Sequence, residues 1–373
     1  MNVTIHEVVT KKDLKQFVLF PFQLFAGCRY WVPPLISGEI STLRKDVNPS
    51  FEYCEARYWL ARSNGKIVGR IAGILNPRSI EKWNQRLIRI GWIDFVDDLE
   101  VSKALFDVVE NWAKELGLEG AHGPLGFTDM DYEGLLVEGF DKLPTITNIY
   151  NYPYYMDHFE KHGYAKVEDW MQYNINASQP VPEKVERINA LIMEKYNLQV
   201  LKFKSLREIR PRIKEVFGAL NHSFTNLYGF VALTDREIDY FVNNYFSFLK
   251  PEFVCLVADA SGKIIGFGIS MPSLSKAMQK AKGRLFPFGF IHILRAMRKN
   301  DTVDLCLTGV LPEWHNKGVH SIYHSEMNKA YIRNKFKTAI TNPQLESNIN
   351  AISAWKSYEK EPYIRRRCYR KIF

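Results

Sequence analysis

The chain has 373 residues, which is long for one domain and predicts two. With 46% hydrophobic and 24% charged residues, its composition is that of an ordinary globular protein and excludes a disordered or collagen-like chain. Lysine and arginine outnumber aspartate and glutamate by 50 to 41. This excess favours acidic partners such as phosphorylated cofactors, anionic lipids or nucleic acids, without choosing among them.

The five cysteines are scattered, which fits neither a metal-binding pair nor a disulfide framework, so we expect a reducing cytosol. The basic stretch at 11–15 and the apolar run after it resemble a lipoprotein signal. Asp13 and Pro21 interrupt that pattern, and we interpret the segment as part of the fold. No apolar run approaches the roughly 18 residues that cross a bilayer.

The pattern of apolar residues repeats along the chain. In the first half, the pattern predicts a strand at 2–9, a helix at 11–25, a hairpin at 57–75, a strand at 92–96 and a helix at 102–116. The second half predicts the same order at 198–203, 205–220, 252–271, 303–310 and 321–333. Proline and small residues cluster at 177–183. We therefore expect two mixed α/β domains, each a twisted sheet flanked by helices, at 1–178 and 198–373, joined by a linker helix at 179–197.

The clearest chemical signal follows the strand at 303–310, where the sequence His315-Asn-Lys-Gly-Val-His320 leads into a helix. A helix N-terminus presents backbone amides and partial positive charge to an anion. Gly318 would let the backbone approach a phosphate closely, and Lys317 would add a full charge. An ordinary connecting loop is the alternative.

This strand, loop and helix resemble the GNAT superfamily of acyl-CoA-dependent N-acyltransferases, over residues 253–360 most specifically. The family's coenzyme loop reads Gln/Arg-x-x-Gly-x-Gly/Ala, and His315 and His320 replace two of its positions. The resemblance implies acetyl-CoA or a longer acyl-CoA as substrate, and no metal. It implies that Val310 pairs with the pantetheine arm. The coenzyme-binding residues it implies are His315, Asn316, Lys317, Gly318, Val319, His320 and Asn348.

The resemblance also suggests two catalytic residues. Asp304 lies fourteen positions before Gly318, where some members carry a general base; otherwise it marks a strand start. The segment 348–358 resembles the family's closing helix, with Trp355 at the position of the usual tyrosine. A phenol can protonate a thiolate and an indole cannot, so Tyr358 is the candidate acid, unless it only packs the helix on the sheet.

The first half is expected to be a degenerate copy. Its corresponding turn, Asp97-Asp98-Leu-Glu-Val-Ser102, has three carboxylates and no glycine. These charges would repel a diphosphate, and no residue permits close backbone approach. A scaffold or acceptor-binding role fits this half better than catalysis.

An insert at 273–300 holds seven cations, no acidic residue and a central apolar segment that includes Phe288. It fits the headgroup region of an anionic membrane, with Phe288 near a lipid substrate; a core helix with solvated ends is the alternative. Its aliphatic character argues against nucleic acid. Arg365, Arg366 and Arg367 would extend this basic surface or be solvated.

His222 and Tyr228 fall where GNAT members close the acceptor pocket, and His222 is either a proton shuttle or an ordinary hydrogen-bonded residue. The spacing of His315, His320 and His324 could suggest zinc, but only Glu313 and Glu326 lie nearby to complete a set, so no metal is expected. The two-domain pattern resembles a bacterial branch that includes ceramide synthases, on the segments Trp31-Val-Pro-Pro34, Gly134-Leu-Leu-Val-Glu-Gly-Phe140 and Tyr150-Asn-Tyr-Pro-Tyr-Tyr155. The sequence thus predicts a cytoplasmic or membrane-peripheral N-acyltransferase for a small-molecule or lipid amine. An aminoacyl transferase acting on a cell-wall precursor and a non-catalytic acyl-CoA-binding protein are the alternatives, and the oligomeric state stays open.

Overall fold

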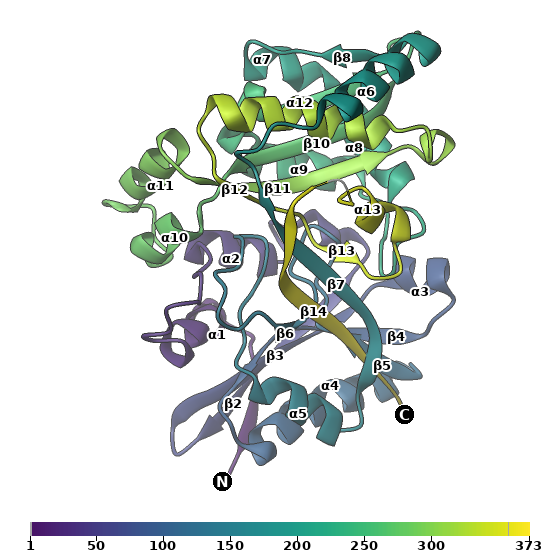
Figure 1. Cartoon of the computed structure of the whole chain (residues 1–373). Coiled ribbons are helices and arrows are strands. Elements are labelled where there is room, and N and C mark those ends of the chain that lie inside the picture. The colour runs from purple at the N-terminus through teal and green to yellow at the C-terminus, as the bar shows by residue number, and fades with distance from the viewer. Residues whose placement is uncertain (1, 357) are drawn as a thin grey trace. The chain divides into compact units, whose positions relative to one another are not determined.

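The protein is seen in a computed structural model that describes residues 2–356 and 358–373. The chain forms two compact units that exchange segments. The first contains the chain up to Trp170 with Ser275–Ile293 and Ile364–Phe373, and the second contains Met171–Leu274 and Leu294–Tyr363. The mixed α/β architecture predicted from the sequence is confirmed (Figure 1). The units depart from boundaries at 178 and 197 because strands near the end of each half hydrogen-bond within the other unit.

The first unit is built on a sheet with helices on both faces. Its strands lie in the order β1-β2-β3-β4-β5-β14, and β6 also pairs with β14. The strands are β1 Thr4–Glu7, β2 Glu55–Ser63, β3 Lys66–Leu75, β4 Leu87–Phe95, β5 Gly120–Gly123, β6 Leu135–Glu138 and β14 Lys360–Ile372. The helices are α1 Lys11–Leu24, α2 Ile36–Leu43, α3 Pro77–Trp83, α4 Leu99–Glu115, α5 Tyr154–Lys161 and α10 Ser275–Ala281.

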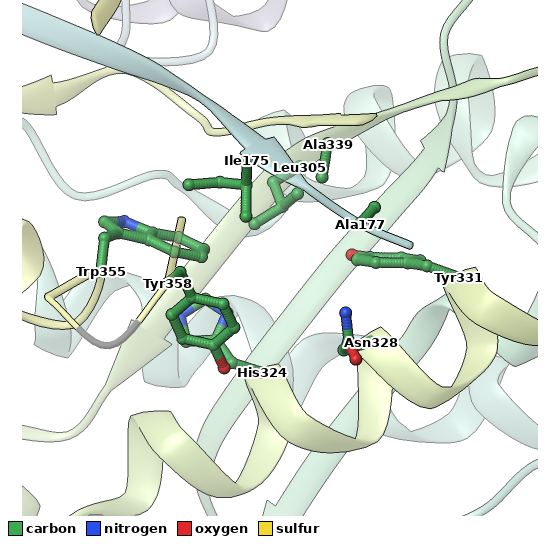
Figure 2. Close-up of a pocket in the computed structure, with 9 residues that line it drawn as sticks. All are labelled: Ile175, Ala177, Leu305, His324, Asn328, Tyr331, Ala339, Trp355 and Tyr358. Atoms are coloured by element: carbon green, nitrogen blue, oxygen red, sulfur yellow. The ribbon is translucent and has the colours of Figure 1, made fainter. Parts of the chain in front are cut away.

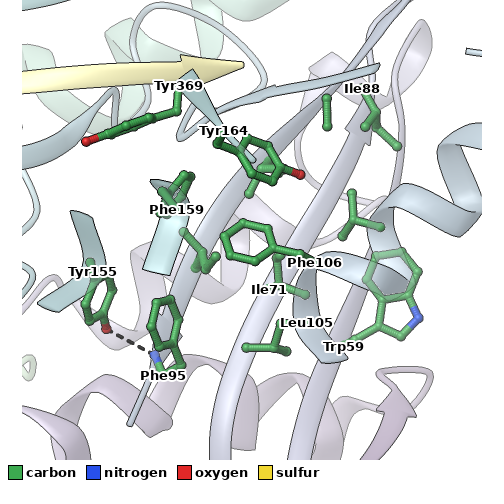
Figure 3. Close-up of a cluster of buried hydrophobic side chains, with 14 of the residues drawn as sticks. Trp59, Ile71, Ile88, Phe95, Leu105, Phe106, Tyr155, Phe159, Tyr164 and Tyr369 are labelled. Carbon is green, nitrogen blue, oxygen red and sulfur yellow. Dashed lines mark hydrogen bonds between the residues drawn. The ribbon is translucent and has the colours of Figure 1, made fainter. Parts of the chain in front are cut away.

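Alternation along the strands of this sheet makes two hydrophobic cores. Trp59 of β2 joins the core with α4 and α5, whereas its neighbour Tyr58 joins the core with α1, because successive strand residues point to opposite faces. In the α4–α5 core, the ring of Phe106 lies 4.9 Å from Phe159 and 4.8 Å from Tyr164 (Figure 3). This packing fixes α4, the helix that follows the central strand β4.

The second unit repeats the plan of the first. Its strands lie in the order β7-β12-β11-β10-β9-β8. They are β7 Ala165–Asn176, β8 Gln199–Leu201, β9 Val254–Ala258, β10 Ile264–Pro272, β11 Thr302–Val310 and β12 Thr338–Ile340, and the short strand β13 is Gln344–Leu345. The helices are α6 Glu183–Tyr196, α7 Leu206–Ile209, α8 Ile213–Ser223, α9 Asp235–Tyr245, α12 Val319–Arg333 and α13 Ile349–Ser353, while the residues of α11 Gly289–Arg298 are divided between the two units.

Glycines on β10 bring α12 close to this sheet. A Cβ on Gly266 would lie 2.6 Å from Val319, and one on Gly268 would overlap Met327. Residues 266 and 268 therefore face α12. On β11, a Cβ on Gly309 would lie 3.0 Å from the Ser223 hydroxyl, which places Gly309 on the α8 face. Helices thus cover both faces of the sheet.

Three sequence-based helix boundaries differ from the structure. The helix expected at 205–220 is broken around Pro211, since proline has no amide to donate, and α8 begins at Ile213. The helix expected from 102 begins three residues earlier, at Leu99, because Asp98 caps it. The closing helix expected across 348–358 is confined to Ile349–Ser353.

Candidate active site

The central parallel strands of the second unit separate after a short contact. β11 pairs with β12 over three residue pairs, the last of which joins Asp304 to Ile340. On its other side, Leu305 and Leu307 stand opposite consecutive residues of β10, so Cys306 between them forms a β-bulge. A bulge bends a strand and increases its twist. The rest of β11 does not pair with β12, and most of its residues are partly exposed.

Backbone groups at the end of β11 face this gap. The amide of Leu311 donates to the Ile265 carbonyl of β10 at 2.9 Å. Because backbone groups alternate between the two edges of a strand, the amide and carbonyl of Val310 point to the edge that β12 has left. Nε2 of His315 lies 3.0 Å from the Val310 carbonyl oxygen. An extended ligand with amide groups could pair with this edge, competing there with the imidazole.

The loop after β11 ends in free backbone amides. The amides of His315 and Lys317 donate to carbonyls within the turn, at 3.1 and 3.4 Å. Within residues 2–356 and 358–373, no acceptor takes the amides of Asn316, Gly318, Val319 or His320. Gly318 caps α12 with a φ of +78° and has no side chain to satisfy those amides. The start of α12 can therefore bind an anion through its main chain.

Helix α6 packs beside this loop. Through this contact Gly318 and Lys317 have packing roles in addition to the anion binding expected of them. A Cβ on Gly318 would lie 2.5 Å from Ile192 of α6. Glycine therefore permits both the positive φ at this position and the close approach of α6. The Lys317 ammonium lies 4.6 Å from the Trp314 ring and 5.6 Å from the Tyr196 ring. The lysine charge is thus held over two aromatic faces.

Asp304 is a buried carboxylate in the middle of the sheet. It is 4% exposed, and neither carboxylate oxygen has a hydrogen bond of ordinary geometry with the described residues. Burial raises its pKa from 3.8 to about 7, and the Ser273 hydroxyl opposes the shift. A carboxylate with a pKa near neutrality can accept a proton at physiological pH.

A small cavity lies on the α12 face of the sheet (Figure 2). Its lining residues are Ile175, Ala177, Leu305, His324, Asn328, Tyr331, Ala339, Trp355 and Tyr358. Its free volume is about 20 Å³, roughly the space of one water molecule and far below the roughly 300–1,000 Å³ of complete ligand pockets. As it stands, the cavity has room for a bound water and not for an acyl group.

Polar atoms in this cavity lack protein partners. The Trp355 indole nitrogen and the Tyr358 hydroxyl are buried without a hydrogen bond to the described residues. The Trp355 ring lies 4.2 Å from His324 and 5.5 Å from Tyr358. Burial raises the pKa of the Tyr358 phenol and lowers that of His324 to about 3, so both are neutral at pH 7. Tyr358 can donate a proton, and His324 can accept a hydrogen bond.

The two candidate catalytic residues lie on opposite faces of the sheet. Leu305 lines the cavity on the α12 face, and Asp304 precedes it on the same strand, so the carboxylate points to the α8 face. Tyr358 lines the cavity. The structure therefore does not place the two side chains on one face of the sheet.

The remaining expected site residues occupy varied places. His222 is exposed in the last turn of α8, next to the residue that faces Gly309, and Tyr228 is half-buried in the loop after that helix. Asn348 caps α13 by accepting the Ala351 amide at 3.2 Å. Phe288, in the insert, is 69% exposed.

Sequence reasoning missed the polar face of α12. The sequence analysis considered His324 only as an improbable metal ligand, and it did not consider Asn328 or Tyr331. Their spacing of four and three residues on an expected helix places them on one face, which is the signal that could have identified them. The bulge at Cys306 has no such signature.

In the first unit, the gap between the corresponding strands is filled. β4 and β5 also pair over three residues, and Arg89 occupies the position of Asp304. Beyond that point the Leu125 amide donates to the Ile90 carbonyl at 2.7 Å, so the chain itself fills the gap. The Asp98 carboxylate caps α4 by accepting the Glu100 amide at 2.8 Å. An internal carboxylate thus occupies the place that an anion would need.

No cluster of metal-ligating side chains occurs within the described residues. Among the same residues, no helix is long and apolar enough to span a membrane.

Known proteins resemble this chain in sequence and in fold. No family model matches the chain. It is 26% identical to Protein YghO of Escherichia coli K12, over 98% of this chain and 95% of that protein. It is 27% identical to a bacterial ceramide synthase of Caulobacter vibrioides, over 79% of this chain and 76% of the relative.

Solved structures show the same fold. A tandem GNAT protein from the clavulanic acid biosynthesis pathway superposes with a TM-score of 0.57 at 11% identity, covering all of this chain and 98% of that one. The GCN5-related glucosamine N-acetyltransferase region of a fungal GH3 β-N-acetylglucosaminidase gives 0.59 at 12% identity, and the match spans 99% of this chain but 38% of that longer protein. The protein is therefore a two-unit protein of the GNAT fold, as its sequence predicted.

Proposed function

We propose that the second unit binds an acyl-CoA and transfers its acyl group directly to a primary amine. The observation that carries this proposal is the continuity between the unpaired edge of β11 and the free amides at the start of α12. The edge matches an extended, amide-containing pantetheine arm, and the helix start matches a diphosphate. The first unit, whose gap is filled, would then serve as scaffold or acceptor platform.

The proposed chemistry needs one base and one acid. The amine nitrogen attacks the thioester carbon, and Asp304 takes the proton that the nitrogen loses, directly or through a water. The tetrahedral intermediate collapses with cleavage of the carbon–sulfur bond. Tyr358 donates its proton to the departing thiolate. With a pKa of about 7, Asp304 is half ionised at neutral pH, and the base requires the ionised form.

We further propose a long-chain donor and a lipid amine acceptor. The support is the similarity to a relative named a bacterial ceramide synthase. The assay is transfer from acyl-CoAs of increasing length to a panel of amines that includes a sphingoid base. Transfer to water-soluble amines alone would contradict the lipid acceptor.

The coenzyme loop is best tested at Asn316. Gly318→Asp would clash with Ile192 and strain a positive φ, so it would confuse folding with binding. Asn316→Asp instead adds one exposed negative charge beside the free amides with almost no change in shape. At about 5–8 Å from a diphosphate in solvent, we expect about 1–2 kcal/mol of repulsion, or about 5- to 30-fold weaker CoA binding by calorimetry.

Asn243→Asp is the matched control, since Asn243 is an exposed residue of α9 and the charge change is the same. Equal CoA affinity in both variants would refute the assignment of the loop. A wild-type protein that binds no acyl-CoA would refute the proposed function.

We also propose that the insert touches an anionic membrane. Phe286 and Phe288 are 76% and 69% exposed, and Ile291 and Leu294 of α11 are also exposed. The cations of the insert are Lys276, Lys280, Lys282, Arg284, Arg295, Arg298 and Lys299. Exposed rings bracketed by cations suit the headgroup boundary.

Vesicle flotation tests this surface. Replacing Phe286 and Phe288 with serine should weaken binding to vesicles containing 30% phosphatidylglycerol at least about tenfold, from the lost apolar burial. Ile349→Ser, at a residue 73% exposed outside the insert, is the control. Undiminished binding by the double variant would contradict the membrane surface.

A further inference from the structure

Arg366 is a buried cation without a hydrogen-bond partner among the residues that the structure describes. It lies on β14 within the first unit, opposite Leu136 of β6, and is 1% exposed. None of its three guanidinium nitrogens has a hydrogen bond with the described residues. Its backbone is fixed closely, since a Cβ on Gly134 would lie 2.8 Å from the Cβ of Arg366.

The neighbouring residues Arg365 and Arg367 form hydrogen bonds with the carboxylate of Asp169. Asp169 accepts from Nε of Arg367 at 2.9 Å and from Nη1 of Arg365 at 3.4 Å. Because alternate strand residues point to opposite faces, Asp169 lies on the face away from Arg366. The expectation that all three arginines would be solvated or form a basic surface is therefore wrong for Arg366.

The charge of Arg366 is not balanced from within the unit. Burial lowers its pKa from 12.5 to about 9, and no acidic side chain opposes that shift. The guanidinium is still protonated at pH 7. An unpaired charge in the interior costs several kcal/mol, so a position like this favours an external counter-ion.

Two acidic residues of the same unit, Asp129 and Glu133, do not balance the charge of Arg366. Burial raises the pKa of Asp129 to about 7 and also raises that of Glu133. The cation that favours their ionised forms is Arg89, together with Lys82 for Asp129, and not Arg366. Their raised pKa values also reduce the negative charge that they carry at neutral pH.

We propose that Arg366 anchors a second binding site, in the first unit, for the carboxylate or phosphate group of a small molecule. The planar guanidinium offers a bidentate fork that matches either oxyanion. This site is separate from the proposed coenzyme loop and does not depend on acyl transfer in the second unit.

The test measures thermal unfolding of the full chain in HEPES and sodium chloride, with phosphate or acetate added at constant ionic strength. Wild-type protein should gain about 2–4 °C at an oxyanion concentration tenfold above Kd. The larger of the two shifts identifies the preferred group. Arg366→Met should unfold at the wild-type temperature or higher without oxyanion, since it removes an unbalanced charge, and should lose the shift.

Arg370→Met is the matched control, because Arg370 lies on the same strand and face but is partly exposed, and it should keep the shift. If Arg366→Met does not fold, Arg366→Lys decides, and it should bind oxyanion at least threefold more weakly because it lacks the fork. An absent shift in wild type, an unchanged shift in the variants, or an equal loss of stability for Arg366→Met in every buffer would overturn the proposal. The last result would mean that Arg366 has a partner within the protein.

Discussion

Replacing Asp304 with asparagine should stabilise the protein, and more so as the pH rises. Burial raises the pKa of this carboxyl from 3.8 to about 7. Between these values the folded protein retains a proton that the unfolded chain has lost. The stability of the wild type therefore falls as pH rises toward 7 and is constant above it. Asparagine keeps the shape of the side chain and removes the charge.

The size of the effect follows from the shift. A difference of 3.2 pKa units (7 − 3.8) at 1.36 kcal/mol each gives about 4 kcal/mol at pH 8. At pH 5 the same calculation gives about 1.6 kcal/mol, since only 1.2 units (5 − 3.8) then separate the two states. These are upper values, because water can reach the carboxylate when it ionises.

The assay is denaturation by urea, followed by tryptophan fluorescence at pH 5, 6, 7 and 8. The advantage of Asp304→Asn over wild type should grow up to pH 7 and then level off. Asp301→Asn, three residues earlier and exposed, should show no such dependence. A pH-independent difference, or an Asp304→Asn protein less stable than wild type at pH 8, would refute the reasoning. The same variant should lose acyl transfer if Asp304 is the base.

Three further changes test other parts of the structure. Tyr358→Phe should lower kcat at least about tenfold while leaving the Kd for CoA unchanged, and equal turnover would exclude the phenol as the acid. Asp98→Ala should cost about 1 kcal/mol by uncapping α4, measured by urea denaturation, and no loss would show that the cap is not needed. Phe106→Ala should cost about 3–5 kcal/mol in the same assay, since its ring is buried between Phe159 and Tyr164, and a cost below 1 kcal/mol would contradict that packing.

Much of the fold could be predicted because its signals are local. The alternation at 252–271 identifies β9 and β10, and helical spacing identifies α12 within two residues of its ends, whereas the linker helix expected at 179–197 forms over Glu183–Tyr196. The loop before α12 was also predictable, since a glycine between a strand and a helix is a short-range pattern. Helix ends were less predictable where one side chain decides them, as Asp98 and Pro211 do.

The sequence by itself determined the doubled mixed α/β plan, the loop at 315–320 and the candidate residues Asp304 and Tyr358. Only the tertiary structure decided which groups in those segments are free. The bulge at Cys306, the contact of Ile192 with Gly318, and the burial of Arg366 without a counter-ion all depend on residues far apart in the chain. Hydrogen bonding and desolvation depend on neighbours in space, and a linear pattern carries no record of them.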